Sequence, residues 1–272
     1  MKTNSKHLGL VTKKFNEFFF VDLKTKENFG NSERFLCKVR KSINFKDQFI
    51  YVGDEVEIDN IDLTSKRAVI ASLKKRQNLL NRPSVANISN IYITFSVEEP
   101  KLNLSQVNRF LISAESMGVE VSLVLTKCDL ISDTRRFSLI DKFEKWGYQA
   151  ITLNLEKSDY FNNLLVELKQ KECSIFMGPS GVGKTTLLNM IIPGLQNSTA
   201  PVSNKIKRGK NTTRNVELFS ISNQSYIVDT PGFNMQPLEV DIRLLPNLFS
   251  EIYKQVIDLS LIHISEPTRQ FR

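Results

Sequence analysis

The chain has 272 residues, of which 41% are hydrophobic and 24% are charged, so it can bury the core of two modest domains. Its net charge of +8 favours an anionic partner, most often nucleic acid, although a merely basic soluble protein is the alternative. Three scattered cysteines and two histidines argue against a disulfide framework and a Cys/His metal cluster, and no apolar run is long enough to span a membrane.

Residues 1–82 are expected to form a small all-β barrel of the OB or SH3 kind. Apolar and polar residues alternate with a period of two in several short runs that polar turns separate. The expected strands are 18–21, 35–39, 50–52 continuing into 56–58, and 68–73.

This first part of the chain also carries most of the positive charge. Residues 1–82 contain 17 Lys and Arg against 10 Asp and Glu, a local net charge of +7. A small basic barrel is suited to binding RNA phosphates, and a solvated basic surface on a structural barrel is the alternative. The candidate RNA-binding residues near its end are Lys74, Lys75 and Arg76.

After Pro83 the pattern changes to strands that alternate with helices, which predicts a mostly parallel sheet. Residues 216–221 and 226–229 are expected to form an antiparallel pair. The other expected strands are 91–95, 121–125, 150–153 and 173–177, and the expected helices are 104–117, 135–146, 160–168 and 185–192.

Residues 178–185 match G-x-x-x-x-G-K-[ST] between an apolar strand and a helix, the context of a phosphate-binding loop. Backbone N–H groups at the helix start would bind phosphates, Lys184 would reach the β- and γ-phosphates, and the Thr185 hydroxyl would ligate Mg²⁺. The predicted nucleotide-binding residues here are Gly178, Pro179, Ser180, Gly181, Val182, Gly183, Lys184, Thr185 and Thr186.

Two further motifs end predicted strands. In T-K-C-D, residues 126–129, the Asp129 carboxylate can accept both guanine N–H donors, and Lys127 would lie along the base; a helix-capping Asp is the alternative. In D-T-P-G, residues 229–232, Asp229 would hold the Mg²⁺ shell and Gly232 would sense a γ-phosphate; a surface turn is the alternative.

Together these motifs resemble the guanine-nucleotide motifs of translation-factor GTPases, in a displaced order. The base-reading motif, Thr126, Lys127, Cys128 and Asp129, lies 52 residues before the phosphate loop, although it comes last in ordinary members. With residues 76–87, 209–214 and the basic barrel, the chain is similar to the RsgA/YjeQ family of circularly permuted GTPases. Thr126 stands where asparagine is usual.

The resemblance implies an α/β P-loop GTPase domain at 83–252, circularly permuted and mostly parallel, preceded by an OB-like barrel at 1–82. It implies a cytoplasmic, monomeric GTP hydrolase with no membrane partner, which binds the small ribosomal subunit and its rRNA and assists late maturation. Mg²⁺ with GTP is the implied cofactor, held by Thr185, Thr213 and Asp229; Thr212 is the alternative to Thr213.

Hydrolysis is expected through Lys184 and Thr213, with Asn211 at the position where the family has a candidate water-orienting histidine. An asparagine can hydrogen-bond water but cannot act as a base, so slow intrinsic hydrolysis is expected. Five cations lie next to the candidate residues Thr212 and Thr213, and they form either a solvated loop or an RNA contact; they are Lys205, Lys207, Arg208, Lys210 and Arg214. The candidates for RNA binding among them are Lys207, Arg208 and Lys210.

The family's following zinc-binding domain is not expected, because no cysteine follows position 173. Zinc binding is therefore not predicted, and residues 253–272 form an atypical tail where that domain would begin. The alternatives to the main interpretation are an RNA-binding protein with a non-hydrolysing nucleotide site and an ATP-using P-loop enzyme.

Overall fold

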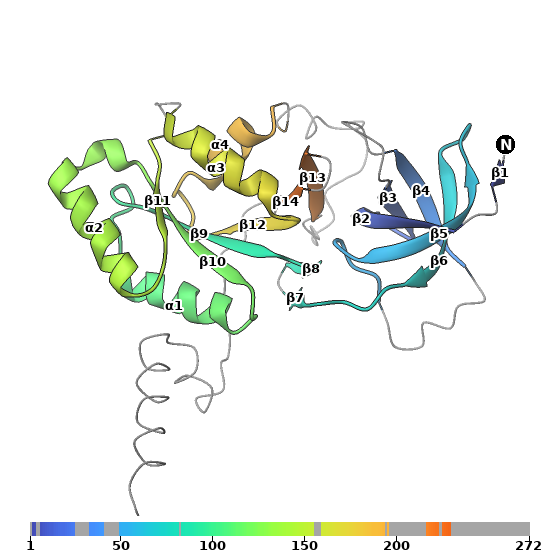
Figure 1. Ribbon diagram of the computed structural model, residues 1–272, viewed down its shortest axis with the longest axis horizontal. Helices are drawn as coiled ribbons and strands as arrows, with labels where there is room; N and C mark the ends of the chain where they lie inside the picture. Colours follow the sequence, from blue (N-terminus) through green and yellow to red (C-terminus); the bar gives the residue numbers. More distant parts are fainter. Residues whose placement is uncertain are drawn as a thin grey trace, which may run out of the picture.

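The computed structural model describes residues 2–3, 6–24, 33–40, 49–81, 83–154, 159–193, 195, 216–222 and 225–229. In this part of the chain a β-barrel lies at one end of the molecule and a layered α/β unit at the other (Figure 1). Strands of both units belong to one continuous sheet of twelve strands.

The barrel is closed by its pairing pattern. The first long strand, β2, pairs antiparallel with both β3 and β5, and β4 pairs in parallel with β6. Its core includes Val11, Val21, Phe35 and Ile58, all fully buried. The OB-like barrel predicted from the sequence is thus confirmed. Its strands are β2 (His7–Phe15), β3 (Phe18–Leu23), β4 (Arg34–Val39), β5 (Glu55–Asp62) and β6 (Arg67–Leu73), and β1 (Lys2–Thr3) pairs with β5.

The chain leaves the barrel through a two-stranded hairpin, β7 (Leu79–Asn81) and β8 (Ser84–Ala86). A side chain at Gly53, whose φ is +90°, would place its Cβ 2.1 Å from the Ala86 carbonyl oxygen, so glycine permits this close approach. Asn87 donates a 2.9 Å hydrogen bond to the Gly53 carbonyl. The expected division after residue 82 falls between β7 and β8 in the sequence and stays a prediction.

The α/β unit has the strand order β13-β14-β12-β9-β10-β11. The strands pair in parallel, except that β13 runs antiparallel to β14. This confirms the predicted mostly parallel sheet. The strands are β9 (Asn90–Ser96), β10 (Glu120–Thr126), β11 (Ala150–Thr152), β12 (Cys173–Met177), β13 (Glu217–Ser222) and β14 (Ser225–Asp229).

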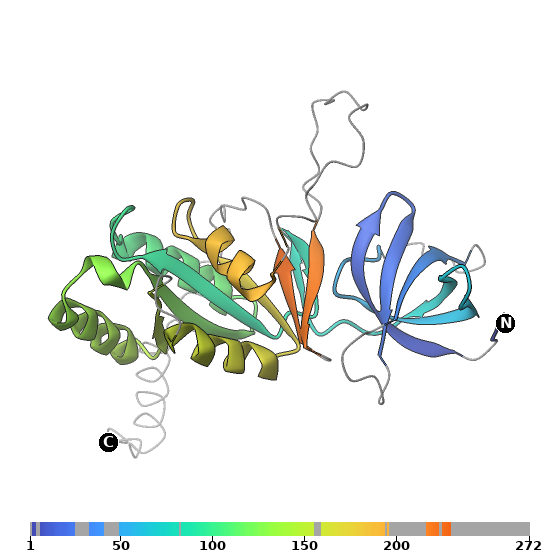
Figure 2. The same cartoon turned by 90° about the horizontal axis from the view of Figure 1, so that it is seen from above.

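Helices cover both faces of this sheet (Figure 2). Along β9, Ile91 and Ile93 pack in the cluster that contains Phe110 of α1, whereas Tyr92 packs in the cluster with Leu187 of α4. The period of two therefore divides the strand between two cores. The helices are α1 (Leu104–Glu115), α2 (Asp133–Lys145), α3 (Asp159–Gln170) and α4 (Lys184–Ile191).

Side-chain caps fix where two helices begin. Asn103 accepts the Gln106 N–H before α1, and Ser132 accepts the Arg135 N–H before α2. The second cap moves the start of α2 ahead of the predicted residue 135.

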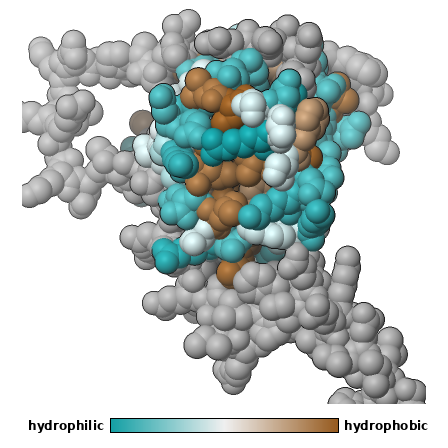
Figure 3. Space-filling model, turned by 90° about the vertical axis from the view of Figure 1, so that its left-hand side faces the viewer, coloured by the Kyte–Doolittle hydropathy of each residue, from teal (hydrophilic) through white to brown (hydrophobic). Residues whose placement is uncertain are grey.

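The end of the molecule that carries α2 shows apolar side chains among hydrophilic ones (Figure 3). Leu130 and Phe137, which are 48% and 61% exposed, belong to this part of the chain. Among the described residues, no helix is both long and apolar enough to cross a membrane.

Candidate nucleotide site

The three predicted nucleotide motifs meet at one edge of the parallel sheet. The T-K-C-D motif begins on the last residue of β10, the phosphate loop follows β12, and Asp229 is the last residue of β14. Because these strands are parallel, their carboxyl ends lie at the same edge, where α/β proteins bind ligands.

The phosphate loop is pressed against the sheet. A Cβ on Gly178 would lie 2.0 Å from the Thr94 carbonyl oxygen, so this position requires glycine. Gly181 and Gly183 have φ values of +83° and +93°, and Gly183 is the N-cap of α4. The loop therefore has the strand, glycine turns and helix start expected of an anion-binding loop.

Lys184 folds back over this loop. Its Nζ donates to the carbonyl oxygens of Gly178 and Pro179 at 2.7 and 2.6 Å. Burial lowers the pKa of Lys184 to about 8. A phosphate beside the ammonium group would favour its charged form, so the lysine is suited to bind one.

The base-reading motif is joined directly to the phosphate loop. The fully buried Thr126 hydroxyl donates to the Val182 carbonyl at 2.6 Å and lies 3.3 Å from the Phe95 carbonyl. The threonine thus bridges the motif and the loop although 56 positions separate the two residues.

The next three residues of the motif have separate roles. Lys127 has a positive φ of 55°, and its Nζ donates to the Glu99 carbonyl. Cys128 is buried, its Sγ lies 3.2 Å from the Leu125 carbonyl, and burial raises its pKa to about 11. The Cys128 thiol therefore stays protonated near neutral pH and has a structural role. Asp129 is exposed in the 3-10 helix η1 (Cys128–Leu130), at the edge where a base would be read.

The turn after β9 lies against both motifs, which sequence reasoning did not predict. The Glu99 carbonyl of this turn accepts the hydrogen bond from Lys127. On the other side, Pro100 Cδ would lie 3.6 Å from a Cβ added to Gly181 of the phosphate loop. Ser96 fixes this turn with a 2.6 Å hydrogen bond to the Pro100 carbonyl. No motif in the sequence marks the turn.

Asp229, at the end of β14, lies on the metal side of the site, where Mg²⁺ is expected. In the antiparallel pair of β13 and β14, Asp229 lies directly opposite Glu217. Burial, and then the nearby Glu217 charge, raise the pKa of Asp229. Carboxylate and hydroxyl oxygens are ligands that Mg²⁺ prefers, so Asp229 and the exposed Thr185 hydroxyl fit that ion. In the described ranges no three His, Cys, Asp or Glu residues gather as a metal site.

Several predicted site residues lie outside the described residues. They are Asn211, Thr212, Thr213, Gly232, Lys207, Arg208, Lys210 and the tail 253–272. Their assignments stay predictions.

The predicted RNA-binding residues of the barrel have intramolecular partners as well. Lys74 pairs with Glu57 at 2.6 Å. Arg76 pairs with the fully buried Asp54 through Nε at 2.6 Å and Nη2 at 2.7 Å, and its guanidinium lies over the Tyr51 ring. Lys75 is exposed. Arg76 therefore has a structural contact, and RNA binding by these three residues stays a prediction.

Phosphate loop, base motif and strand order define a P-loop GTPase in which the base motif precedes the phosphate loop. The family model of the RsgA GTPase matches residues 73–239. The chain belongs to this RsgA GTPase family and is a GTP hydrolase by class, as the motifs predicted.

Relatives and solved structures agree with this assignment. The chain is 38% identical over 256 residues to the small ribosomal subunit biogenesis GTPase RsgA of Prochlorococcus marinus strain NATL1A, covering 94% of this chain and 80% of the relative. The protein of the same name from Synechococcus sp. strain CC9605 is 40% identical over 227 residues, covering 84% and 75%.

Two crystal structures share the fold. YjeQ from Thermotoga maritima is 29% identical with a TM-score of 0.72, covering 92% of this chain and 82% of that one. YloQ, described as a circularly permuted GTPase, is 24% identical with a TM-score of 0.73, covering 92% and 80%. The expected circularly permuted fold is confirmed.

Proposed function

We propose that this chain binds GTP between the T-K-C-D motif and the phosphate loop and hydrolyses it while bound to the rRNA of the small ribosomal subunit, assisting late maturation. The hydrogen bond from Thr126 to Val182 carries the first part, because it joins the two motifs into one site. The names of the relatives support the second part.

The proposed chemistry is positioning and charge stabilisation without a covalent intermediate. The N–H groups of the phosphate loop and Lys184 would bind the phosphates, and Asp129 would accept the guanine N–H donors. Thr185, Thr213 and, through a water, Asp229 would hold Mg²⁺. The ion, when bound, neutralises charge on the phosphates.

The orientation of the attacking water is proposed to limit the rate of GTP hydrolysis. Asn211 can hydrogen-bond a water but cannot take its proton near neutral pH. We expect the isolated protein to hydrolyse GTP slowly, and the ribosomal subunit to accelerate hydrolysis by positioning Asn211 and Thr213 at the nucleotide.

The proposed RNA contact uses the excess of positive charge. The barrel part, residues 1–82, has 17 Lys and Arg against 10 Asp and Glu. Phosphate binding by such a surface depends strongly on salt. The candidates are Lys74, Lys75, Arg76, Lys207, Arg208 and Lys210. A monomeric, cytoplasmic protein fits this role.

Two measurements test the proposal. Asp129→Asn should exchange preference for guanine nucleotides for preference for xanthine nucleotides, because an amide donates where the carboxylate accepts. GTP turnover should increase when purified small ribosomal subunits are added. Equal binding of ATP and GTP would contradict the guanine site, and turnover that subunits do not change would contradict the ribosomal role.

A further inference from the structure

Two carboxylates face each other at the metal side of the site. Glu217 begins β13 and Asp229 ends β14, and the register of this antiparallel pair places them directly opposite. Like charges at opposite positions of a strand pair repel each other and destabilise it. A nearby cation is therefore needed to compensate Glu217.

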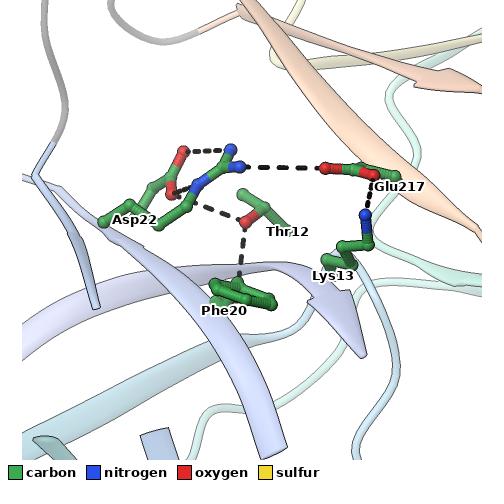
Figure 4. Close-up of polar contacts among 6 residues, drawn as sticks. Thr12, Lys13, Phe20, Asp22 and Glu217 are labelled. Atoms are coloured by element: carbon green, nitrogen blue, oxygen red, sulfur yellow. Dashed lines mark hydrogen bonds and ion pairs between the residues drawn. The ribbon is translucent and has the colours of Figure 1, made fainter. Parts of the chain in front are cut away.

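The barrel supplies that cation. Lys13 of β2 lies opposite Glu217 in the pairing of β2 with β13, and its Nζ is 2.5 Å from Glu217 Oε2 (Figure 4). The Glu217 side chain is 19% exposed, so solvent screens this pair less than a pair on the open surface. The contact joins residues 204 positions apart.

A second barrel cation, Arg34, pairs mainly with Asp22 and only weakly with Glu217. Its Nε and Nη2 bind the buried Asp22 at 2.7 and 3.3 Å, whereas its Nη1 is 3.7 Å from Glu217 Oε1. Thr12 donates to the same Asp22 at 3.4 Å. Since Asp22 balances Arg34, the charge that balances Glu217 is that of Lys13.

We propose that Glu217 is a positioning residue for the metal side of the nucleotide site, and that Lys13 of the barrel sets the net charge beside Asp229. Lys13, Glu217 and Asp229 lie in a row from β2 across β13 to β14, in which one positive charge is followed by two negative charges. Docking of the barrel thereby tunes how strongly the site retains Mg²⁺ and nucleotide. This inference rests on the proposed role of Asp229.

The test compares two single variants that remove opposite charges. Lys13→Gln removes the positive charge that balances Glu217 and makes the net charge near the Mg²⁺ site more negative, so less Mg²⁺ should be needed for half-maximal retention of a fluorescent GDP analogue. Glu217→Gln leaves Lys13 unbalanced and should raise that concentration. Each shift should be about threefold, and the double variant should return to the wild-type value.

Lys14→Gln is the matched control. It removes the same charge one position along β2, where the lysine Nζ lies over the Phe19 ring, and should leave the Mg²⁺ concentration unchanged. Lys13→Arg keeps the charge and should behave as wild type. Thermal unfolding of every variant verifies that it is folded.

A merely structural contact would give a different pattern. If the Lys13–Glu217 pair only held the barrel in place, loss of either partner would change the Mg²⁺ requirement in the same direction. That result would overturn the inference. So would unchanged values in both, while Asp229→Asn still raises the Mg²⁺ requirement and keeps the proposed site intact. If Asp229→Asn has no effect, the proposed metal site and the inference are both wrong.

Discussion

The Thr126 hydroxyl donates a 2.6 Å hydrogen bond to the Val182 carbonyl, so the residue that starts the base motif holds the middle of the phosphate loop. The sequence suggested a departure at this position, since asparagine is usual there. The shorter threonine side chain still bridges the two motifs because β10 and the loop lie close together.

Thr126→Val should weaken binding of both GDP and GTP. The substitution keeps the shape but leaves the Val182 carbonyl without this donor in a buried place, which costs about 1–3 kcal/mol. Nucleotide titration and urea unfolding measure the two effects. Thr94→Val is the control, because the Thr94 hydroxyl bonds the Tyr92 carbonyl of its own strand. Equal losses of affinity in both variants would contradict the role given to Thr126.

Gly178→Ala should disrupt the phosphate loop. Its Cβ would meet the Thr94 carbonyl oxygen at 2.0 Å, and backbone cannot move aside cheaply. We expect loss of nucleotide binding and a stability cost of roughly 1–3 kcal/mol or more. At Gly118 the φ is also positive, but no atom lies within 4 Å of the Cβ position. Gly118→Ala therefore separates conformational strain from steric overlap and should bind nucleotide normally.

Arg76→Leu should destabilise the barrel by about 3 kcal/mol, because it leaves the fully buried Asp54 carboxylate without its bidentate partner. Chemical unfolding measures this cost. Lys75→Gln, at the exposed neighbouring position, should leave stability unchanged and weaken RNA binding in a salt-dependent way. A stable Arg76→Leu variant would show that the Asp54 pair does not hold the barrel.

The pH dependence of nucleotide binding should report Lys184. Its pKa is lowered to about 8, so the nucleotide-free protein loses the Lys184 proton at a lower pH than a free lysine does, whereas bound phosphates favour the cation. GDP affinity should fall as the pH rises from 7 to 9, and Lys184→Gln should lack this part of the fall. Parallel pH profiles for the two proteins would contradict the prediction.

The same shift has a consequence for stability without nucleotide. The folded pKa of about 8 lies below the ordinary value of 10.5, so between these values the unfolded chain binds more protons than the folded chain. The contribution of Lys184 is unfavourable below pH 8 and diminishes as the pH rises toward 10.5. Unfolding midpoints of wild type and Lys184→Met should therefore converge over this range.

Sequence reasoning predicted the elements that have strong local patterns. The fully buried runs of β12 and β9 and the glycine spacing of the phosphate loop all follow from residue type. It missed β2, His7–Phe15, because the strand pattern is broken by the adjacent Lys13 and Lys14 and by Thr12, a polar residue that is fully buried beside Asp22. It also missed the hairpin of β7 and β8, which has three residues in each strand.

The contacts that complete the site could not be predicted in this way. The Lys13–Glu217 pair and the Thr126–Val182 hydrogen bond join positions 204 and 56 residues apart, and neither leaves a periodic signal. The register of β13 on β14 depends on both strands and on a shift between Ser220 and Ser222. Only the assembled sheet brings these groups together.

The strand order also determines when each part of the sheet can form during synthesis. The three parallel strands β9, β10 and β11 leave the ribosome as neighbours, β12 then adds at the edge of β9, and β14 adds to β12. The barrel strand β2 is made near the start, yet its partner β13 is the second-last strand of the described residues to emerge. In a nascent chain the barrel and the sheet of β9, β10 and β11 can thus both be folded before the pairing of β2 with β13 connects them.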